Sequence, residues 1–508
     1  MENFMNSEAF LRHHRLESNP FRGEEARQDA VFTRLETECR HPEFEKILGD
    51  PHHPAAAVVF GERGSGKTAL RLQLESAIVE GNRSNPGARC LVVDHDEFNP
   101  MLGAIGASLR KDDRDAVVSS VTLSDHLDVI LARAVPVVVD AVLSGRPPTS
   151  GSLEGLEDAR KAARQAPLAS RRELQRLQAL YDGDPDAGLR ADRLRRVLHL
   201  PGRSRTGLTM AGMILLFVLA ITWGILVGAG VVKGADGAMA LPSFILVLGA
   251  VASGGCWLWS LFRLRRVAKA AARRLRALGR NREAFVPTLR ELPPGKLWGS
   301  LPPESRGGDE WRIQSLEGLA EVLRRIGVPG TIILVDRVDE PVAVTGAVSR
   351  MRSLAWPLFR NKVLQMPGVG MKFLLPLELR DELRRESSDF FQEARLDKQN
   401  LVERLAWSGS MLFDLCNARL AACSNEEPAP RLMELFDDSV ARQDVVDALD
   451  QMQQPRDAFK MLYGVIQEHC SNVVEEEAAF QVDKTTLDLV RKRQVERKEG
   501  MLRGVRPG

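Results

Sequence analysis

Short apolar runs rich in β-branched residues recur along the chain and predict the buried strands of a parallel sheet. They lie at 55–60, 89–94, 330–335 and 371–376. Between them, apolar residues return at helical spacing, as they do from Ala69 to Glu80. Because strands alternate with helices in this order, the pattern favours an α/β fold.

Two much longer apolar runs, Gly207 to Val232 and Leu241 to Phe262, carry no charged residue. A helix needs about 20 residues to cross the ~30 Å hydrocarbon core of a bilayer, and both runs exceed that length. They predict a two-helix transmembrane hairpin, with a pair of buried core helices as the alternative. Small residues such as Gly249 and Gly254 stand at spacings that would let the two helices touch.

Cationic residues crowd both sides of this hairpin, whereas the link between its helices is nearly neutral. They are Arg190, Arg193, Arg195, Arg196, Arg203 and Arg205 before it, and Arg263, Arg265, Arg266, Lys269, Arg273, Arg274 and Arg276 after it. The positive-inside rule then predicts a cell-membrane protein with both termini in the cytoplasm and the lipid bilayer as a partner. A bacterial origin is implied only by the family resemblance described below. The basic helix after the hairpin either lies on anionic lipid or is simply solvated.

Composition narrows the function only slightly. The 508 residues exceed what one compact core usually holds, so several domains are expected. A net charge of +2 gives no general affinity for nucleic acid. The six cysteines lack C-x-x-C spacing, which argues against a zinc site or a disulfide framework, and the polar first residues argue against a cleaved signal peptide.

A glycine-rich loop joins the first predicted strand to the first predicted helix and fits G-x-x-x-x-G-K-[ST]. Its residues are Gly61, Glu62, Arg63, Gly64, Ser65, Gly66, Lys67 and Thr68. Such a loop wraps phosphates with backbone N–H groups, while Lys67 reaches the β and γ phosphates and the Thr68 hydroxyl holds Mg²⁺. The predicted cofactors are ATP, with GTP possible, and Mg²⁺. The alternative is a chance glycine-rich turn.

Acidic residues follow the third apolar run directly. Asp336 stands at the carboxyl end of the predicted strand, where open α/β sheets bind ligands, so we expect it in the Mg²⁺ shell. Either Asp339 or Glu340 would polarise the attacking water, and the sequence does not choose between them. The alternative is a buried strand that ends in a solvated acidic turn. We also expect the acidic turn at 94–97 to be solvated, with a metal site there as the alternative.

The order of strand, phosphate loop, helix, strand, insertion and acidic strand resembles P-loop NTPases of the additional-strand class. A transmembrane hairpin between the two nucleotide motifs resembles the KAP family, over about 31–100 and 313–470 of this chain. The resemblance implies a P-loop NTPase parallel sheet with a helical insertion, the hairpin and a C-terminal helical lid. The segment 454–459 looks like the second sensor motif of AAA+-like and STAND proteins, which implies that Arg456 contacts the γ-phosphate. The alternative is a helix-surface arginine.

The predicted organisation has seven parts. They are an N-terminal helical segment (1–50), the first part of the NTPase core (51–120), a helical insertion (121–206), the hairpin (207–262), a basic helix and linker (263–310), the second part of the core (311–400), and a helical lid with a charged tail (401–508). Together they favour a membrane-anchored ATPase that acts as a nucleotide-dependent switch, through lid movement or homo-oligomerisation, on an unknown protein partner. The alternatives are a nucleotide-binding scaffold with little hydrolysis and a pore built from hairpins. No nucleic-acid site is indicated.

Overall fold

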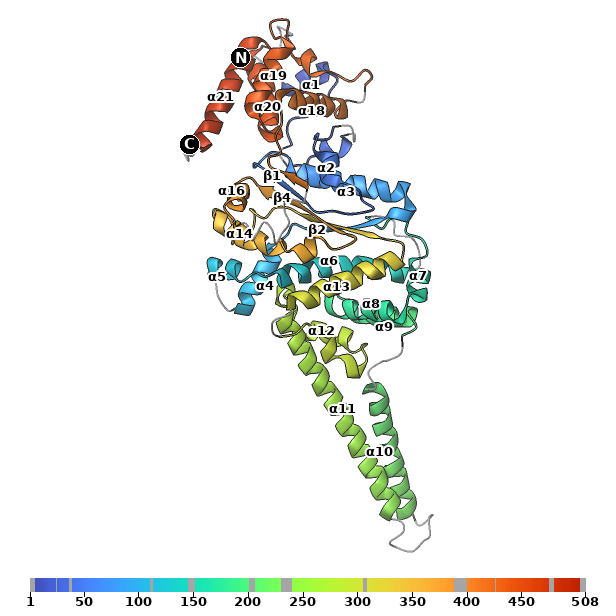
Figure 1. Ribbon diagram of the computed structural model, residues 1–508. Helices are drawn as coiled ribbons and strands as arrows, with labels where there is room; N and C mark the ends of the chain where they lie inside the picture. The colour runs from blue at the N-terminus through green and yellow to red at the C-terminus, as the bar shows by residue number, and fades with distance from the viewer. Residues whose placement is uncertain are drawn as a thin grey trace.

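Three regions follow one another along the molecule in Figure 1: a helical bundle that holds both termini, a sheet covered by helices, and a long helical hairpin. The computed structural model describes residues 5–23, 25–35, 39–109, 113–144, 151–200, 206–229, 240–304, 308–387, 400–424, 426–474 and 479–502.

The sheet has five parallel strands in the order β2-β3-β4-β1-β5. They are β1 (Ala57–Gly61), β2 (Cys90–His95), β3 (Gly330–Val335), β4 (Val369–Pro376) and β5 (Asn400–Val402). The four apolar runs are therefore confirmed as strands of an α/β parallel sheet. The three-residue β5 was not predicted from the sequence. β4 pairs with both β1 and β3 and so joins the early part of the chain to the late part.

Alternate residues of each strand face opposite sides of the sheet. On one side Val59 and Leu334 pack against α2 (Phe44–Leu48) and α3 (Lys67–Ser84), while on the other Val58 and Ile333 enter a much larger helical core. Besides the last turns of α11 (Ala240–Arg274), the helices of that second core are α4 (Asn99–Leu109), α5 (Arg114–Ser119), α6 (Leu123–Ser144), α7 (Ala159–Gln165), α8 (Leu168–Tyr181), α9 (Ala187–Val197), α12 (Arg282–Leu289), α13 (Gly308–Arg325), α14 (Val348–Ala355), α15 (Asn361–Leu364) and α16 (Glu378–Arg384).

The two long apolar runs form a hairpin of α10 (Thr206–Gly228) and α11 (Ala240–Arg274), which extends away from the body (Figure 1). Small residues let the helices approach: a side chain at Gly254 would meet Met213 Sδ at 3.0 Å, and one at Gly249 would meet Leu216 Cδ1 at 3.3 Å. The prediction that these helices span a membrane is not confirmed, since no helix among the described residues is both long and apolar enough to do so.

The terminal bundle combines residues from both ends of the chain. Its helices are α1 (Ser7–His13), α18 (Gly409–Ala422), α19 (Arg442–Met452), α20 (Pro455–Asn472) and α21 (Lys484–Leu502). Phe10 and Phe21 lie in the same buried cluster as Leu412 and Met461. The N-terminal residues therefore pack into the predicted lid, which Figure 1 shows as blue α1 among red helices.

A buried ion-pair network fixes the base of the hairpin to the helices under the sheet. Arg312 on α13 makes two 2.7 Å bonds to Asp128 on α6 and also donates to the carbonyl of Arg274, the last residue of α11. Arg276, just beyond α11, bonds both carboxylate oxygens of Asp125 at 2.9 and 2.8 Å. Because these charges are withdrawn from water, each depends on its partner. The end of α11 is thereby held against α6 and α13.

Two fully buried histidines link β2 to α6 and α14. His126 Nε2 lies 2.9 Å from the carbonyl oxygen of Leu354 and therefore carries the proton, so its Nδ1 accepts from His95 Nε2 at 2.8 Å. Burial lowers the pKa of His126 to about 4 and lowers that of His95 as well. Both rings are thus neutral in the folded protein.

We expect this histidine pair to make the protein acid-sensitive. The unfolded chain takes up protons below about pH 6.5 while the folded chain resists until about pH 4, so stability present above pH 6.5 is lost across that window. The loss is about 1.4 kcal/mol per pH unit for each depressed histidine. We expect the free energy of unfolding, measured by urea unfolding at several pH values, to fall less steeply with decreasing pH in His126→Asn. The exposed His53 gives the control His53→Asn, and an unchanged slope in His126→Asn would contradict the prediction.

Candidate functional site

The glycine-rich loop turns sharply between β1 and α3. Gly64 and Gly66 have φ angles of +94° and +92°, in the left-handed region that favours glycine. A side chain at Gly64 would also meet Gln454 Oε1 at 2.9 Å and Arg456 Cβ at 3.1 Å. Gly64 is therefore required both by the turn and by the close approach of the terminal bundle.

Lys67 begins α3 and folds back over the loop. Its Nζ donates to the carbonyl oxygens of Gly61 at 2.8 Å and Glu62 at 2.9 Å. Burial lowers the pKa of Lys67, while the nearby carboxylates of Asp339 and Asp336 act in the opposite direction. The Lys67 ammonium group is thus held beside the glycine-rich loop by two carbonyl oxygens, and carboxylates lie close by.

Thr68 and Asp336 meet across the sheet edge, although 268 residues separate them in the sequence. The Thr68 hydroxyl donates to Asp336 Oδ2 at 2.9 Å, and the backbone N–H of Arg337 donates to Oδ1 at 2.9 Å. Asp336 is 1% exposed, and burial raises its pKa against the effect of these two bonds. The structure therefore brings together the two residues predicted to hold Mg²⁺.

The two candidate catalytic acids differ in their surroundings. Glu340 is half exposed and forms a 2.6 Å ion pair with Arg337, which has a left-handed φ of 63°. Asp339 is partly buried, and its charge raises the pKa of Lys67 more than the charge of Asp336 does. Both acids line the same cavity, and Asp339 is the one whose charge is directed at the loop lysine.

A buried arginine that the sequence did not single out neutralises the acids behind the loop. Arg71 on α3 is 2% exposed, bonds Asp94 Oδ1 at 2.6 Å and lies 3.9 Å from oxygens of Asp96 and Asp336. The expectation of a solvated acidic turn at 94–97 is therefore wrong for Asp96 and His95, which are buried. Asp96 is held there because Arg71 and other arginines compensate its charge.

The terminal bundle makes direct contacts with the glycine-rich loop. Glu62 accepts from Gln454 and, at 2.6 Å, from Arg404. The Trp407 indole donates to the Ser65 carbonyl oxygen at 2.8 Å. The backbone N–H of Arg456 donates to the Gly64 carbonyl oxygen at 3.4 Å. Movement of the bundle would therefore change contacts of the loop itself.

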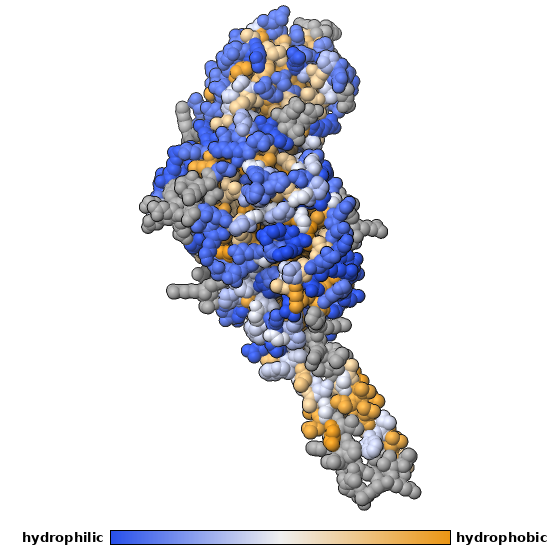
Figure 2. Space-filling view, turned by 45° about the vertical axis from the view of Figure 1, so that its right-hand side comes forward, coloured by the Kyte–Doolittle hydropathy of each residue, from blue (hydrophilic) through white to orange (hydrophobic). Residues whose placement is uncertain are grey.

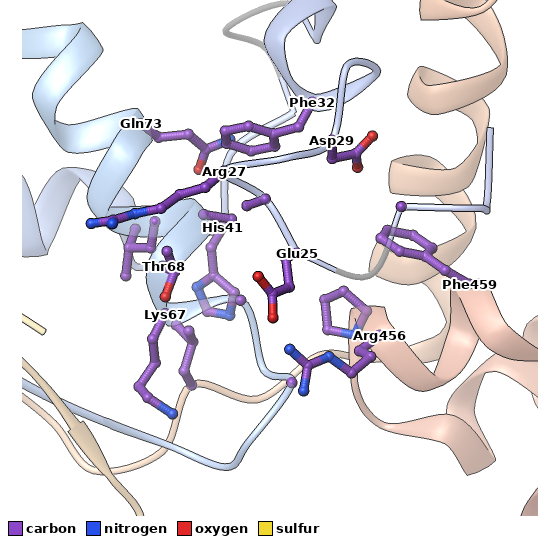
Figure 3. Close-up of a pocket in the computed structure, with 18 of the residues that line it drawn as sticks. Glu25, Arg27, Asp29, Phe32, His41, Lys67, Thr68, Gln73, Arg456 and Phe459 are labelled. Carbon is purple, nitrogen blue, oxygen red and sulfur yellow. The ribbon is translucent and has the colours of Figure 1, made fainter. Parts of the chain in front are cut away.

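A cavity of about 200 Å³ lies between the loop, the acidic turn after β3, the N-terminal segment and α20. Figure 3 shows Lys67 and Thr68 on one side and Arg456 on the other, with the Arg456 guanidinium directed into the space. Arg456 Nε is buried and has no hydrogen-bond partner among the described residues. Burying such a donor without a partner is costly, so the site is suited to an added acceptor.

N-terminal residues line this cavity, which the sequence analysis missed. Figure 3 shows Arg27 and Asp29 beside the cavity. Arg27 pairs with Asp96, directly after β2, and Asp29 pairs with Arg419 of α18 at 2.7 Å. Both pairs join residues far apart in the chain. The sequence analysis placed this segment only within the predicted N-terminal helical segment, and nothing in its pattern pointed to the cavity.

Comparison of the chain with models of protein families, with curated proteins and with solved structures finds no match. Within the described ranges, no group of three or more His, Cys, Asp or Glu residues is arranged to hold a metal ion.

Arg71 gives a sharp test of the buried charge cluster. Arg71→Met leaves several buried carboxylates without their shared cation, so the free energy of unfolding should fall by about 3–5 kcal/mol. Arg83 lies on the same helix but at the surface, paired with Glu80 and Glu154. Arg83→Met should leave urea unfolding nearly unchanged, and equal effects of the two substitutions would refute a special role for Arg71.

Proposed function

We propose that this protein is an ATPase that acts as a nucleotide-dependent switch, with ATP, or GTP in its place, bound together with Mg²⁺ at the glycine-rich loop. The observation that carries the proposal is the 2.9 Å bond between Thr68 and Asp336. A hydroxyl at the start of a helix and a carboxylate at the end of a parallel strand are the two protein ligands that P-loop NTPases offer to Mg²⁺.

The strand order supports this proposal. β4 lies between β1, which leads into the glycine-rich loop, and β3, which leads into Asp336. One strand inserted between these two is the arrangement after which the additional-strand class of P-loop NTPases is named. The hairpin between β2 and β3 adds the resemblance to the KAP family, as an analogy of architecture.

The residues present fit a Mg²⁺–nucleotide. Thr68 and Asp336 supply the hard oxygen ligands that Mg²⁺ prefers, and phosphate oxygens and water would complete its shell. The turn at Gly64 and Gly66 and the N-terminus of the 18-residue α3 present backbone N–H groups to an anion. When bound, the ion neutralises charge that develops on the phosphates.

In the proposed reaction the chain positions groups and supplies charge. Lys67 would exchange the carbonyl oxygens of Gly61 and Glu62 for phosphate oxygens. Asp339 is the better candidate to orient and deprotonate the attacking water, because Glu340 is half exposed and paired with Arg337. Arg456, whose Nε has no hydrogen-bond partner among the described residues, would offer its guanidinium to the γ-phosphate and release it after hydrolysis.

The switch would be read out through the terminal bundle. Arg456 lies in the first turn of α20 and contacts Gly64, and Gln454 and Arg404 both bond Glu62 of the same loop. Loss of the γ-phosphate contact would therefore weaken the attachment of the bundle to the sheet. Such a change in lid position or in self-association is what a protein partner would recognise.

We propose a lipid bilayer as the site of anchoring. Apolar side chains stand exposed along the hairpin, among them Leu215 at 60% and Ile225 at 65% (Figure 2). Exposed apolar surface of this extent normally marks a membrane or a protein interface. With the hairpin in the bilayer, the nucleotide site would face the cytoplasm of the cell.

Hydrolysis by the detergent-solubilised protein tests the enzyme directly. Lys67→Ala and Asp336→Asn should each lower turnover by at least about 100-fold, because each removes charge stabilisation from the phosphates or the metal. Lys362, an exposed lysine paired with Glu310, gives the control Lys362→Ala. Tight binding without turnover in the parent would favour the scaffold alternative, and no nucleotide binding would overturn both.

Arg456 should discriminate ATP from ADP. Removing a charge-assisted hydrogen bond in Arg456→Met should weaken ATP binding about 10- to 100-fold and leave ADP binding nearly unchanged. The matched control is Arg493→Met, since Arg493 also lies in the bundle but pairs with Glu468 at the surface. Calorimetric titration with ATP and with ADP gives the ratio of the two dissociation constants. An equal loss for ATP and ADP would rule out a γ-phosphate contact.

A further inference from the structure

One exposed face of α11 changes abruptly from apolar to cationic near the body of the protein. Trp259 and Phe262 are 66% and 54% exposed, and Arg266, Lys269 and Arg273 continue the same face at intervals of three and four residues. The change from Phe262 to Arg265 takes three residues, or about 4.5 Å of helix. Such a short transition matches a boundary between hydrocarbon and water.

The opposite face of the same turns is buried. Leu264, Val267, Ala268 and Ala271 lie in the core under the sheet. The base of α11 is thus fixed, and its cationic side is directed away from the body. The exposed apolar residues of the hairpin begin where it leaves the body, as Figure 2 shows.

Three cations of this face, Arg265, Arg266 and Lys269, differ from those nearer the end of the helix, where Glu304 lies close to Arg273. No aspartate or glutamate occurs between 237 and 282. Among the residues that the structure describes, none forms an ion pair with Arg265, Arg266 or Lys269, although the Arg266 guanidinium lies 5.6 Å from the centre of the Phe262 ring. By contrast, Arg274 and Arg276 at the end of the helix pair with Glu304 and Asp125. The three exposed cations are therefore available to an external anion.

We propose that Arg265, Arg266 and Lys269 form a binding surface for anionic phospholipid headgroups. The inference rests on the proposed anchoring of the hairpin in a bilayer and specifies the lipid that surrounds it. A phosphate-bearing headgroup would meet the cations, while its acyl chains would cover Trp259 and Phe262. Nucleic acid could satisfy the charge but would leave the adjoining apolar side chains in water, so anionic lipid fits the whole surface.

Vesicle flotation of the full chain after detergent removal tests the proposal. Vesicles of phosphatidylcholine alone are compared with vesicles that also contain phosphatidylglycerol. We expect preferential partitioning into the anionic vesicles, weakened by salt. Replacing one cation by glutamine should reduce this preference about fivefold, and the triple variant Arg265→Gln, Arg266→Gln, Lys269→Gln should reduce it roughly 100-fold. Partitioning into phosphatidylcholine should not change.

The control is the double variant Lys492→Gln, Arg497→Gln, which removes exposed charges on α21 at the far end of the molecule (Figure 1). Equal partitioning of the parent into both vesicles, or an unchanged preference in the triple variant, would overturn the proposal. Binding to neither vesicle, with cross-linking of hairpins between copies, would show that a second chain covers this surface. Nucleotide binding is measured on the same samples, so failure of the headgroup site is distinguished from failure of the nucleotide site.

Discussion

The parallel pairing of β4 with both β1 and β3 is the constraint on which the candidate site depends. β1 carries the glycine-rich loop and β3 carries Asp336, yet neither strand touches the other. β4 fixes both in register, with Val59 opposite Leu374 and Ile333 opposite Met371. The carboxyl ends of the strands therefore reach the same edge, and Thr68 and Asp336 come within hydrogen-bond distance.

Gathering these ends also gathers negative charge, and the surrounding structure balances it. Asp94, Asp96 and Asp336 end neighbouring strands or follow them directly, and Arg71 stands among all three. Arg71, Asp96 and Asp336 are buried, so removing this cation costs more than the loss of a surface ion pair. Arg27 reaches the same cluster from the N-terminal segment. The charge balance of the site thus ties the sheet to the residues that close the cavity.

The sequence predicted those features that local pattern determines. β3 and Asp336 were found because a continuous apolar run ends in an acid, and Lys67 because the loop motif has fixed spacing. β5 was missed because three residues carry no periodicity. Arg71 lies on a helix face whose apolar neighbours predict burial, but a charge there gives no sign of its partners. The pairing of Arg27 with Asp96 depends on the tertiary fold, which brings two distant segments together, and a single sequence does not show which segments these are.

The position of the hairpin between β2 and β3 has a consequence for folding during translation. β1 and β2 emerge first, but they are not neighbours in the sheet, and the strands that separate them are made only after the hairpin. The nascent sheet therefore cannot close until β3 and β4, which follow the hairpin, have also been translated. Throughout that interval two apolar strands stay unpaired, a state that invites aggregation and gives chaperones a natural substrate.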